Sequence, residues 1–324
     1  MKPLLSVVMP TYNGERFISA ALESVRDQHD DGIELVIVDD GSSDRTLEIV
    51  RSFAGALPIR LITPGRLGNW VAITNLGLRE AVGDWACFLH QDDLWLPGRL
   101  KRLRSDMERN QGALIVHNAI YVGPDGQALG PWTCPLSEGG VASNRFIERL
   151  LVQNFIAIPS PVFRRDAALH SGGLDEALWF SADWDLWLRL GALGPVRFIG
   201  ESLSAFRVHP ASQTAARKLQ PNEWEQQLTT VLAHHLESWP VTGKLRTSVE
   251  RVAMASIAVN SALSAASRGE PVKPTAVLLQ LFALGPRGWH RYLRDSRIVE
   301  RVGSRLKMQR LTRPSNTAFS APQN

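Results

Sequence analysis

Two stretches of sequence decide the fold: SVVMPTYNGERFISAALESVRDQ at residues 6–28 and ELVIVDDGSSDRTLEIV at residues 34–50. In each, an apolar run ends at polar and turn-forming residues, and apolar positions then recur at helical spacing. The alternation continues with apolar runs at 59–62 and 85–89 and a helical pattern at 68–82. Strands that alternate with helices predict βαβ units, and therefore an α/β fold with a mostly parallel sheet flanked by helices.

Length and composition set the broad class. The 324 residues predict about two domains. A hydrophobic content of 44% and a charged content of 21% are ordinary for a globular protein and exclude a wholly disordered or collagen-like chain. The net charge of +4 is too small to indicate a nucleic-acid partner. The cysteines, Cys87 and Cys134, form no C-x-x-C pair and indicate a reducing compartment.

The apolar runs of the chain are short. None approaches the roughly 18–20 residues of a membrane span. The N-terminal residues lack the long apolar region of a signal peptide. We therefore expect a cytoplasmic protein that is at most peripheral to the inner face of the membrane.

The character of the sequence changes near residue 218. Strand and helix patterns alternate before it, whereas helical patterns dominate after it. Within the first part, residues 123–143 are rich in Gly and Pro and are predicted to be loop, and residues 202–218 lack periodicity and are predicted to be a mobile loop. We predict a catalytic domain, a helical C-terminal region and a disordered tail, at residues 1–218, 219–311 and 312–324.

Polar residues follow three of the predicted strands. Residues 11–13 follow the first strand, Asp39 and Asp40 the second, and residues 90–93 the fourth. The carboxyl ends of parallel strands meet at one rim of a sheet, where ligands bind. This convergence predicts a ligand site at the rim.

The carboxylates of this rim have two interpretations each. Residues 39–41 can contact a base or ribose, or they can belong to a helix-capping turn, because Ser42, Ser43 and Asp44 follow them. Asp92 and Asp93 can hold Mg²⁺ or Mn²⁺ together with substrate phosphates, or they can cap the helix predicted from Pro97.

Taken together and in order, the motifs resemble a known family. The two opening stretches, with GNWVAITNLGLREAVGDWACFLHQDDLWLPGRL at 68–100, resemble the start of a family 2 glycosyltransferase with the GT-A fold. NFIAIPSPVFRRDAALHSGGLDEAL at 154–178, SADWDLWLRLGALG at 181–194 and ESLSAFRVH at 201–209 resemble the acceptor half and closing loop of that family. The resemblance covers residues 4–215 and does not reach the C-terminal third.

The resemblance implies a function. It is that of an inverting, metal-dependent glycosyltransferase that moves a single sugar from a nucleotide-sugar, foremost a UDP-sugar, to a hydroxyl of a glycan or lipid-linked acceptor in cell-surface polysaccharide synthesis. The chain lacks the Arg-Trp pair of the processive synthases, which favours single addition. Two alternatives stay open: a nucleotidyltransferase, although residues 10–17 supply no Gly-rich phosphate loop, and a non-catalytic sugar-nucleotide or membrane-binding module.

The resemblance also assigns the donor site. Asp40 would bind the uracil edge, and Asp92 with Asp93 would hold Mn²⁺ or Mg²⁺. His90 stands where the family has the first Asp of its Asp-x-Asp motif, and it would contact ribose or join the metal ligands. The implied nucleotide-binding residues are Pro10, Thr11, Tyr12, Glu15, Asp40, Asn69, Asn75 and Asp92.

The acceptor side is assigned in the same way. Asp183 would be the general base that takes the proton of the acceptor hydroxyl; its place at a helix start also allows a capping role. Asp185 is the rival acid, but two residues further along a helix it points elsewhere. Arg207 and His209 would contact the diphosphate, or they would be solvated residues of the predicted loop.

Residues 287–313 carry a concentrated positive charge. They contain nine basic and two acidic residues, a net charge of +7, with apolar residues between them. Such a helix can lie on an anionic membrane, or it can pack its apolar side against the domain and leave its charges in water. The resemblance gives no help in this segment, and both interpretations stay open.

Overall fold

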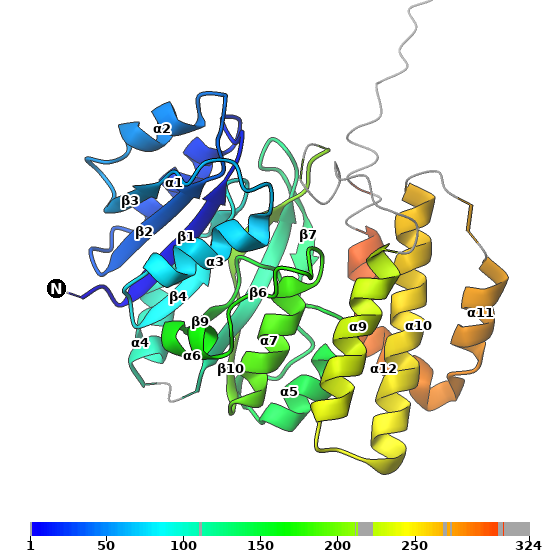
Figure 1. The fold of residues 1–324 in the computed structure, drawn as a ribbon. Coiled ribbons are helices and arrows are strands. Elements are labelled where there is room, and N and C mark those ends of the chain that lie inside the picture. Colours follow the sequence, from blue (N-terminus) through cyan, green and yellow to red (C-terminus); the bar gives the residue numbers. More distant parts are fainter. Residues whose placement is uncertain are drawn as a thin grey trace, which may run out of the picture.

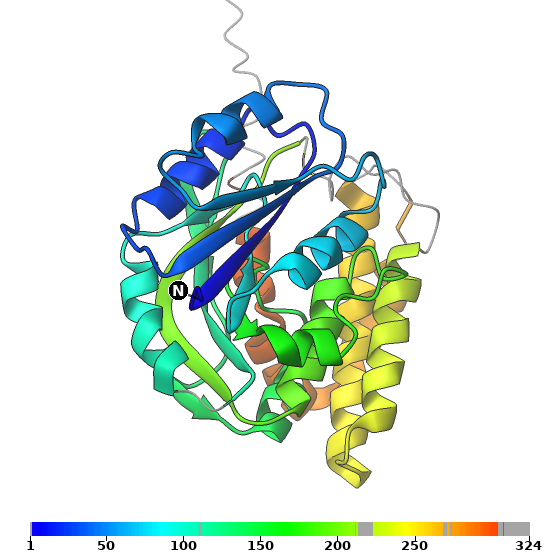
Figure 2. The ribbon, with the colours of Figure 1, turned by 60° about the vertical axis from the view of Figure 1, so that its left-hand side comes forward.

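A computed structural model describes residues 2–109, 112–210, 212, 223–267, 271–272, 274–303 and 307. Its centre is a ten-stranded sheet in the order β3-β2-β1-β4-β9-β6-β10-β5, with β7 paired to β6 and β8 to β10. Helices cover both faces of the sheet, and a group of C-terminal helices packs beside it (Figures 1 and 2). The α/β fold with a helical C-terminal region is confirmed.

The N-terminal half forms the parallel part of the sheet. β1 lies between β2 and β4 and is parallel to both, and β3 continues the parallel order beyond β2. Every residue of β1 is buried, which is expected of a strand covered on both faces. The elements are β1 (Leu5–Thr11), α1 (Ile18–Arg26), β2 (Ile33–Asp39), α2 (Thr46–Ser52), β3 (Ile59–Ile62), α3 (Trp70–Glu80) and β4 (Trp85–Phe88).

The second half makes the sheet mixed. β9 is antiparallel to both β4 and β6, whereas β10 is parallel to β6 and antiparallel to β5. The elements are β5 (Leu94–Trp95), α4 (Arg99–Arg109), β6 (Leu114–Val122), β7 (Ala128–Trp132), β8 (Gly139–Val141), α5 (Ser143–Leu150), β9 (Val162–Arg164), α6 (Arg165–His170), α7 (Ala182–Ala192) and β10 (Val196–Arg207).

Two predicted loops contain strands. Residues 123–143 hold the edge strands β7 and β8, and β7 accommodates Gly130 and Pro131, as only an edge strand readily does. The predicted loop at 202–218 is wrong at its start, because β10 continues to Arg207. The pairing of β10 with β6 shifts register twice between Ile199 and Ser204, and this bulge removes the alternation by which a strand is recognised in sequence.

Two apolar cores lie on opposite faces of the sheet. One packs α1 and α4 against β1, β2 and β4, and the other packs α3, α5 and α7 against the same sheet and extends to the C-terminal helices. The two cores fix the strands between them, so the loops at the rim have a rigid base.

The C-terminal region is a set of helices docked on the α5 and α7 side of the sheet domain (Figure 1). The helices are α9 (Glu223–Ser238), α10 (Gly243–Ser267), α11 (Pro274–Phe282) and α12 (Gly285–Ser296). The predicted boundary at residue 218 and the predicted tail at 312–324 lie outside the described residues. Among the helices that the structure describes, none has the length and apolar character of a membrane span.

Much of the basic charge predicted at 287–313 is used inside the protein. Arg291 pairs with Glu148 of α5 at 2.5 Å, and Arg294 with the buried Asp295 at 2.7 Å. Arg297 pairs with Glu300. Residues 304–306 and 308–313 lie outside the described part of the chain. The described part of the segment therefore packs on the domain and uses its charge to do so.

Candidate active site

Three loops meet at the carboxyl rim of the parallel strands, as their sequence positions predict. The Tyr12 N–H donates to Gln91 Oε1 at 2.9 Å, and Gln91 Nε2 donates back to the Tyr12 carbonyl at 3.0 Å. The Asp40 N–H donates to the Thr11 carbonyl at 2.8 Å. The residues after β1, β2 and β4 are thus tied into one surface.

Asp39 organises the turn that follows β2. Its carboxylate accepts hydrogen bonds from Thr11 Oγ1 at 2.9 Å, from the Ser42 N–H at 2.8 Å and from Ser42 Oγ at 2.6 Å. Gly41 follows in the left-handed region at φ 78°, where a side chain would be strained. Asp39 therefore has the turn-forming role, whereas the carboxylate of Asp40 takes no part in this turn and contacts residues 66–68.

Asp40 is buried and faces residues 66–68. Its carboxylate accepts from Arg66 Nη1 at 2.8 Å and from the N–H groups of Leu67 and Gly68 at 2.5 and 3.0 Å. The Arg66 guanidinium in turn lies over the Tyr12 ring, 3.5 Å from its centroid. A base bound at Asp40 and Tyr12 must share or displace the contacts that Arg66 makes.

The other residues assigned to the base pocket after β1 take different positions. Pro10 and Thr11 lie within β1, opposite Val38 and Asp39 of β2. Glu15 is more exposed, and its carboxylate accepts a hydrogen bond from the Arg45 N–H at 3.1 Å. Glu15 thus holds the start of α2 in this structure.

The two asparagines of α3 use their amides on the segment that leads to α7. Asn69 caps α3 by accepting from the Val71 N–H at 3.0 Å and donates to the Glu176 carbonyl at 3.2 Å. Asn75 exchanges two hydrogen bonds with the backbone of Leu174, at 2.8 and 2.9 Å. In this arrangement both residues position the 174–176 segment against α3.

His90, Asp92 and Asp93 form a cluster that fits a divalent cation. One ligand atom from each lies within 4.8 Å of the others. Within the described structure, neither His90 Nε2 nor Asp93 Oδ2, both buried, has a hydrogen-bond partner. Burial lowers the pKa of His90, so the imidazole is neutral and can donate a lone pair. Burial and the nearby Asp92 raise the pKa of Asp93 well above its usual range, a strain that a bound cation would relieve.

The end of β10 holds this cluster in place. The Arg207 N–H donates to Asp93 Oδ1 at 2.9 Å, and its guanidinium Nε donates to the Asp92 carbonyl at 2.8 Å. His209 Nε2 lies 2.9 Å from Asp92 Oδ2. The Phe17 ring packs against both Arg207 and His209. Both carboxylates therefore face the end of β10.

The solvated interpretation of Arg207 and His209 is wrong. The two residues are only 4% and 5% exposed, because β10 carries them under the rim. The Arg207 guanidinium also donates to the carbonyls of Gly123 and Pro124, at 3.1 and 2.9 Å. In this structure Arg207 fixes the loop that carries Asp92 and Asp93.

Asp183 lies in the first turn of α7. One carboxylate oxygen accepts from Asn154 Nδ2 at 3.0 Å, and the other accepts from the N–H of the next residue, Trp184, at 2.8 Å. The N-cap of α7 is Ser181, so the capping interpretation of Asp183 is wrong. Part of its surface stays accessible, but desolvation outweighs these hydrogen bonds and raises the pKa of Asp183 to about 6. Asp183 is therefore ionised at neutral pH and more basic than an ordinary carboxylate.

Asp185 is directed into a different part of the fold. Its carboxylate accepts from Arg189 Nη2 at 2.6 Å and lies 2.8 Å from His235 Nε2 of α9. Burial alone would raise the pKa of Asp185, but the hydrogen bond to His235 and the charge of Arg189 outweigh burial and lower it. Asp185 thus fastens α9 to α7.

Trp70 connects the cluster of His90, Asp92 and Asp93 with the segment that leads to Asp183. Its ring lies edge-on to His90, with centroids 5.3 Å apart, and its Nε1–H donates to the Trp179 carbonyl at 3.0 Å. Trp179 precedes Asp183 by four residues. The indole therefore places the segment leading to Asp183 beside the cluster.

Sequence reasoning missed three residues of this site. Arg66 stands in a Gly-rich stretch, Gln91 within the metal-binding motif, and Trp70 among apolar helix positions. Their partners lie 26, 79 and 109 residues away in the sequence. Of the three, only Gln91 could have been found from the sequence, because it lies between His90 and Asp92.

Comparison with known proteins shows which family the N-terminal part of the chain is similar to. The family model of glycosyl transferase family 2 matches residues 6–159. An uncharacterised glycosyltransferase of Rickettsia typhi is 26% identical over 235 residues, which cover 69% of this chain and 70% of that protein. The amylovoran biosynthesis glycosyltransferase AmsB of Erwinia amylovora is 30% identical over 197 residues, 58% of this chain and 64% of AmsB.

The fold also matches a solved structure over nearly its whole length. Residues 1–349 of S. aureus TarS, in complex with UDP-GlcNAc, superpose with a TM-score of 0.65 and 16% identity. The match covers 96% of this chain and 91% of that one, and so includes the C-terminal helices. At this identity the likeness establishes the GT-A fold.

Proposed function

We propose that the protein, whose residues 6–159 match the family model of glycosyl transferase family 2, transfers a single sugar from a UDP-sugar to a hydroxyl group of a glycan or lipid-linked acceptor. The observation that carries the proposal is the cluster of His90, Asp92 and Asp93, joined through Trp70 to the segment that bears Asp183. The name of AmsB supports a role in cell-surface polysaccharide synthesis. A lipid-linked acceptor would bring the protein to the inner face of the membrane.

The base of the donor binds, in this proposal, between Tyr12 and Asp40. A carboxylate at the end of β2 can accept the imide N–H of uracil, and an aromatic ring supplies a stacking face. The Arg66 guanidinium already lies over the Tyr12 ring, so the face of this ring can pack against a flat polar group. The UDP-GlcNAc complex of TarS, which has the same fold, supports the choice of a UDP-sugar.

A divalent cation, Mn²⁺ or Mg²⁺, would be held by Asp92 and Asp93 with His90 as a third ligand. Carboxylate oxygens suit both ions. When bound, the cation neutralises charge on the diphosphate leaving group. Arg207 and His209 keep the two carboxylates turned toward that place, since their hydrogen bonds fix Asp92 and Asp93 from the β10 side.

Asp183 acts as the general base. Its pKa of about 6 leaves the carboxylate ionised at pH 7, and its raised basicity favours uptake of the proton of an acceptor hydroxyl. Removal of that proton accompanies attack on the sugar carbon from the side opposite the diphosphate, which inverts the configuration. Asp185 is unsuited to this role, because Arg189 and His235 hold its carboxylate at the junction with α9 and its pKa is lowered, which makes it a weaker base.

The proposal is tested by incubating the purified full-length protein with a panel of UDP-, GDP- and dTDP-sugars, with Mn²⁺, Mg²⁺ or EDTA. We expect slow release of nucleoside diphosphate from a UDP-sugar, lost in EDTA and restored by the ion. Release of pyrophosphate from a nucleoside triphosphate and a sugar phosphate would instead show a nucleotidyltransferase. Binding of a nucleotide-sugar without turnover, with or without added glycan acceptors, would show a non-catalytic module.

A further inference from the structure

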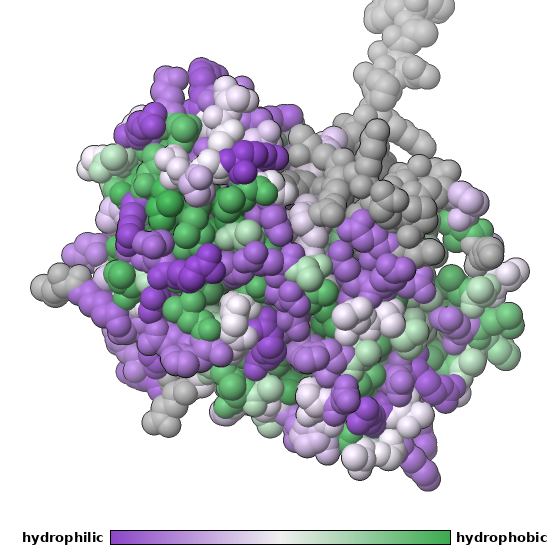
Figure 3. All heavy atoms as spheres, viewed as in Figure 1, coloured by the Kyte–Doolittle hydropathy of each residue, from purple (hydrophilic) through white to green (hydrophobic). Residues whose placement is uncertain are grey.

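Helix α11 turns an apolar surface outward. None of its residues is buried, and Leu278, Leu279 and Phe282 are 63%, 69% and 85% exposed. With Trp289 of α12, they line a shallow hollow of about 540 Å³. Figure 3 shows hydrophobic side chains gathered at the edge of the molecule that α11 forms. We call this surface the α11 face.

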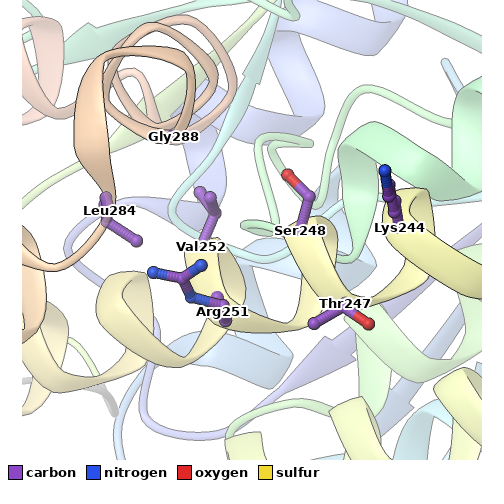
Figure 4. Close-up of a pocket in the computed structure, with 7 residues that line it drawn as sticks. All are labelled: Lys244, Thr247, Ser248, Arg251, Val252, Leu284 and Gly288. Carbon is purple, nitrogen blue, oxygen red and sulfur yellow. The ribbon is translucent and has the colours of Figure 1, made fainter.

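A basic hollow adjoins the α11 face. It has a volume of about 350 Å³ and lies between the start of α10 and the connection from α11 to α12. Two cationic and two hydroxyl side chains extend into this region from α10, with Leu284 and Gly288 across from them (Figure 4). The lining residues are Lys244, Thr247, Ser248, Arg251, Val252, Leu284 and Gly288.

The two hollows lie next to each other at the start of α12, and we call the boundary between them the edge. Gly288 lines the basic hollow, and its neighbour Trp289 lines the apolar one. The Arg251 guanidinium donates to the carbonyl of Ala283, the residue that follows Phe282. A ligand that spans this edge therefore meets cations and hydroxyl groups on one side and aliphatic and aromatic carbon on the other.

Cationic side chains outnumber acidic ones around this edge. Residues 274–293 contain no Asp or Glu, and the exposed Arg287 lies among them. Lys244 and Arg251 add two further exposed cations, and the nearest acid in sequence is Glu250 on α10. Arg291 is paired with Glu148 of α5, whereas Lys244 and Arg251 line the basic hollow and the exposed Arg287 directly precedes Gly288, which lines the same hollow.

We propose that the α11 face and the basic hollow dock the protein on a bilayer that contains anionic phospholipid. Ammonium, guanidinium and hydroxyl groups suit the oxygens of a phosphate headgroup. Leu278, Leu279 and Phe282 enter the boundary of the acyl chains, with Trp289 at the interfacial level that tryptophan prefers. The complementary charge of the lipid distinguishes this partner from a second copy of the chain, which would bring Lys244, Arg251 and Arg287 against like charges.

The surface proposed here differs from the basic segment 287–313, in which Arg291, Arg294 and Arg297 form ion pairs within the protein. Docking does not rest on glycosyl transfer, because it can be measured without a donor or an acceptor. Failure of the docking test leaves the proposed activity standing, and failure of the activity test leaves docking standing.

The test is co-sedimentation of the full-length protein with vesicles of phosphatidylcholine alone or with phosphatidylglycerol, at low and high salt. We expect binding to the anionic vesicles that weakens as salt rises. Leu278→Ser with Phe282→Ser lowers partitioning about tenfold or more. Leu193→Ser is the matched control, because Leu193 is 59% exposed on the sheet domain, and it leaves binding unchanged.

The basic hollow is tested separately. Lys244→Gln and Arg287→Gln each lower partitioning about fivefold, the usual contribution of one cation near an anionic surface. Lys101→Gln, on the exposed side of α4, removes the same charge and has no effect. At matched ionic strength, inorganic phosphate releases no more protein than chloride does, because a free phosphate replaces only the headgroup contacts and the apolar contacts remain.

Three results overturn the proposal. The first is a protein that stays in the supernatant at low salt, including one that binds inorganic phosphate alone. The second is wild-type partitioning of the Leu278→Ser, Phe282→Ser variant. The third is a wild-type dimer, seen by analytical sedimentation without lipid, that dissociates in the Leu278→Ser, Phe282→Ser variant. The α11 face would then join two copies of the chain.

Discussion

The rim of the sheet buries charged side chains, whereas the α11 face exposes large apolar ones. At the rim, Asp40, Asp93 and Arg207 are buried and held by hydrogen bonds from strands and loops that are distant in sequence. On α11, Leu278 and Phe282 stand in water. Burying charge and exposing large apolar side chains both cost free energy. The two departures from ordinary packing mark the two surfaces to which we assign ligands: a charged donor at the rim and a lipid at α11.

The comparison separates the residue that we propose as the base from residues that attach one part of the protein to another. In the sheet domain, Asp183 keeps a raised pKa and part of its surface accessible, whereas Asp185, two residues away, is used to attach α9. In the helical region, the charge of Arg291 is likewise used for attachment. Substitutions at these positions should therefore have different readouts.

The largest effect is expected at Asp183. Asp183→Asn keeps the size of the side chain but removes the base, so transfer should fall about 10²- to 10⁴-fold. Binding of UDP should not change, because no contact assigned to the nucleotide is altered. The measurements are initial rates of transfer and calorimetric titration of UDP on the folded variant. Near-wild-type transfer would remove Asp183 from the role of base.

Asp185→Asn is the matched change at the neighbouring attachment site. It removes the negative charge that pairs with Arg189 and that lies against His235, which should lower the free energy of unfolding by about 3 kcal/mol. The loss is measured by urea denaturation. Any fall in the rate of transfer should be proportional to the fraction of the protein that is unfolded under the assay conditions. A stable Asp185→Asn protein with no transfer would reverse the roles of the two acids.

The pH dependence sharpens the same contrast. Because the pKa of Asp183 is raised to about 6, the reactive carboxylate is lost at a higher pH than for an ordinary acid. The rate of transfer should be level above pH 7 and fall about tenfold per pH unit below 6. The profile is measured at saturating donor and cation. A rate that stays level down to pH 4.5 would contradict a base with this pKa.

A smaller effect is expected where the helical region docks. Arg291→Ala removes a partly buried ion pair with Glu148 and should cost about 1 kcal/mol of stability, seen in thermal unfolding. Arg60→Ala breaks a more exposed pair with Glu80 and is the control, with a smaller change. UDP affinity should be unchanged in both variants. Loss of UDP affinity in Arg291→Ala would show that the two regions are coupled.

The sequence alone predicts the parallel strands of the N-terminal half, but it does not predict the edge strand β7 or the end of β10. Apolar runs placed β1, β2, β3 and β4 correctly, because buried parallel strands are continuously apolar. The end of β10 was missed, because a bulge breaks its alternation. β7 was missed, because Gly130 and Pro131 resemble a turn.

The site divides in a similar way. The convergence of three strand ends follows from the geometry of a parallel sheet, and the resemblance supplied roles for Asp40, Asp92 and Asp183 as predictions. Arg66 and Trp70 could not be found in the same way, because their contacts join segments that only the folded chain brings together. Periodicity describes neighbours along one element and carries no information about such pairs.

The central claim is that the rim binds a nucleotide through Asp40 and a cation through Asp92, and calorimetric titration of UDP tests it most directly. Wild type, Asp40→Ala and Asp92→Ala are each titrated with and without Mn²⁺. Asp40→Ala should weaken binding about tenfold or more under both conditions, since its partner is the base. Asp92→Ala should match wild type without the ion and lose the gain in affinity that Mn²⁺ gives to wild type. Equal losses in both variants regardless of Mn²⁺, or no binding of UDP by wild type, would contradict the account.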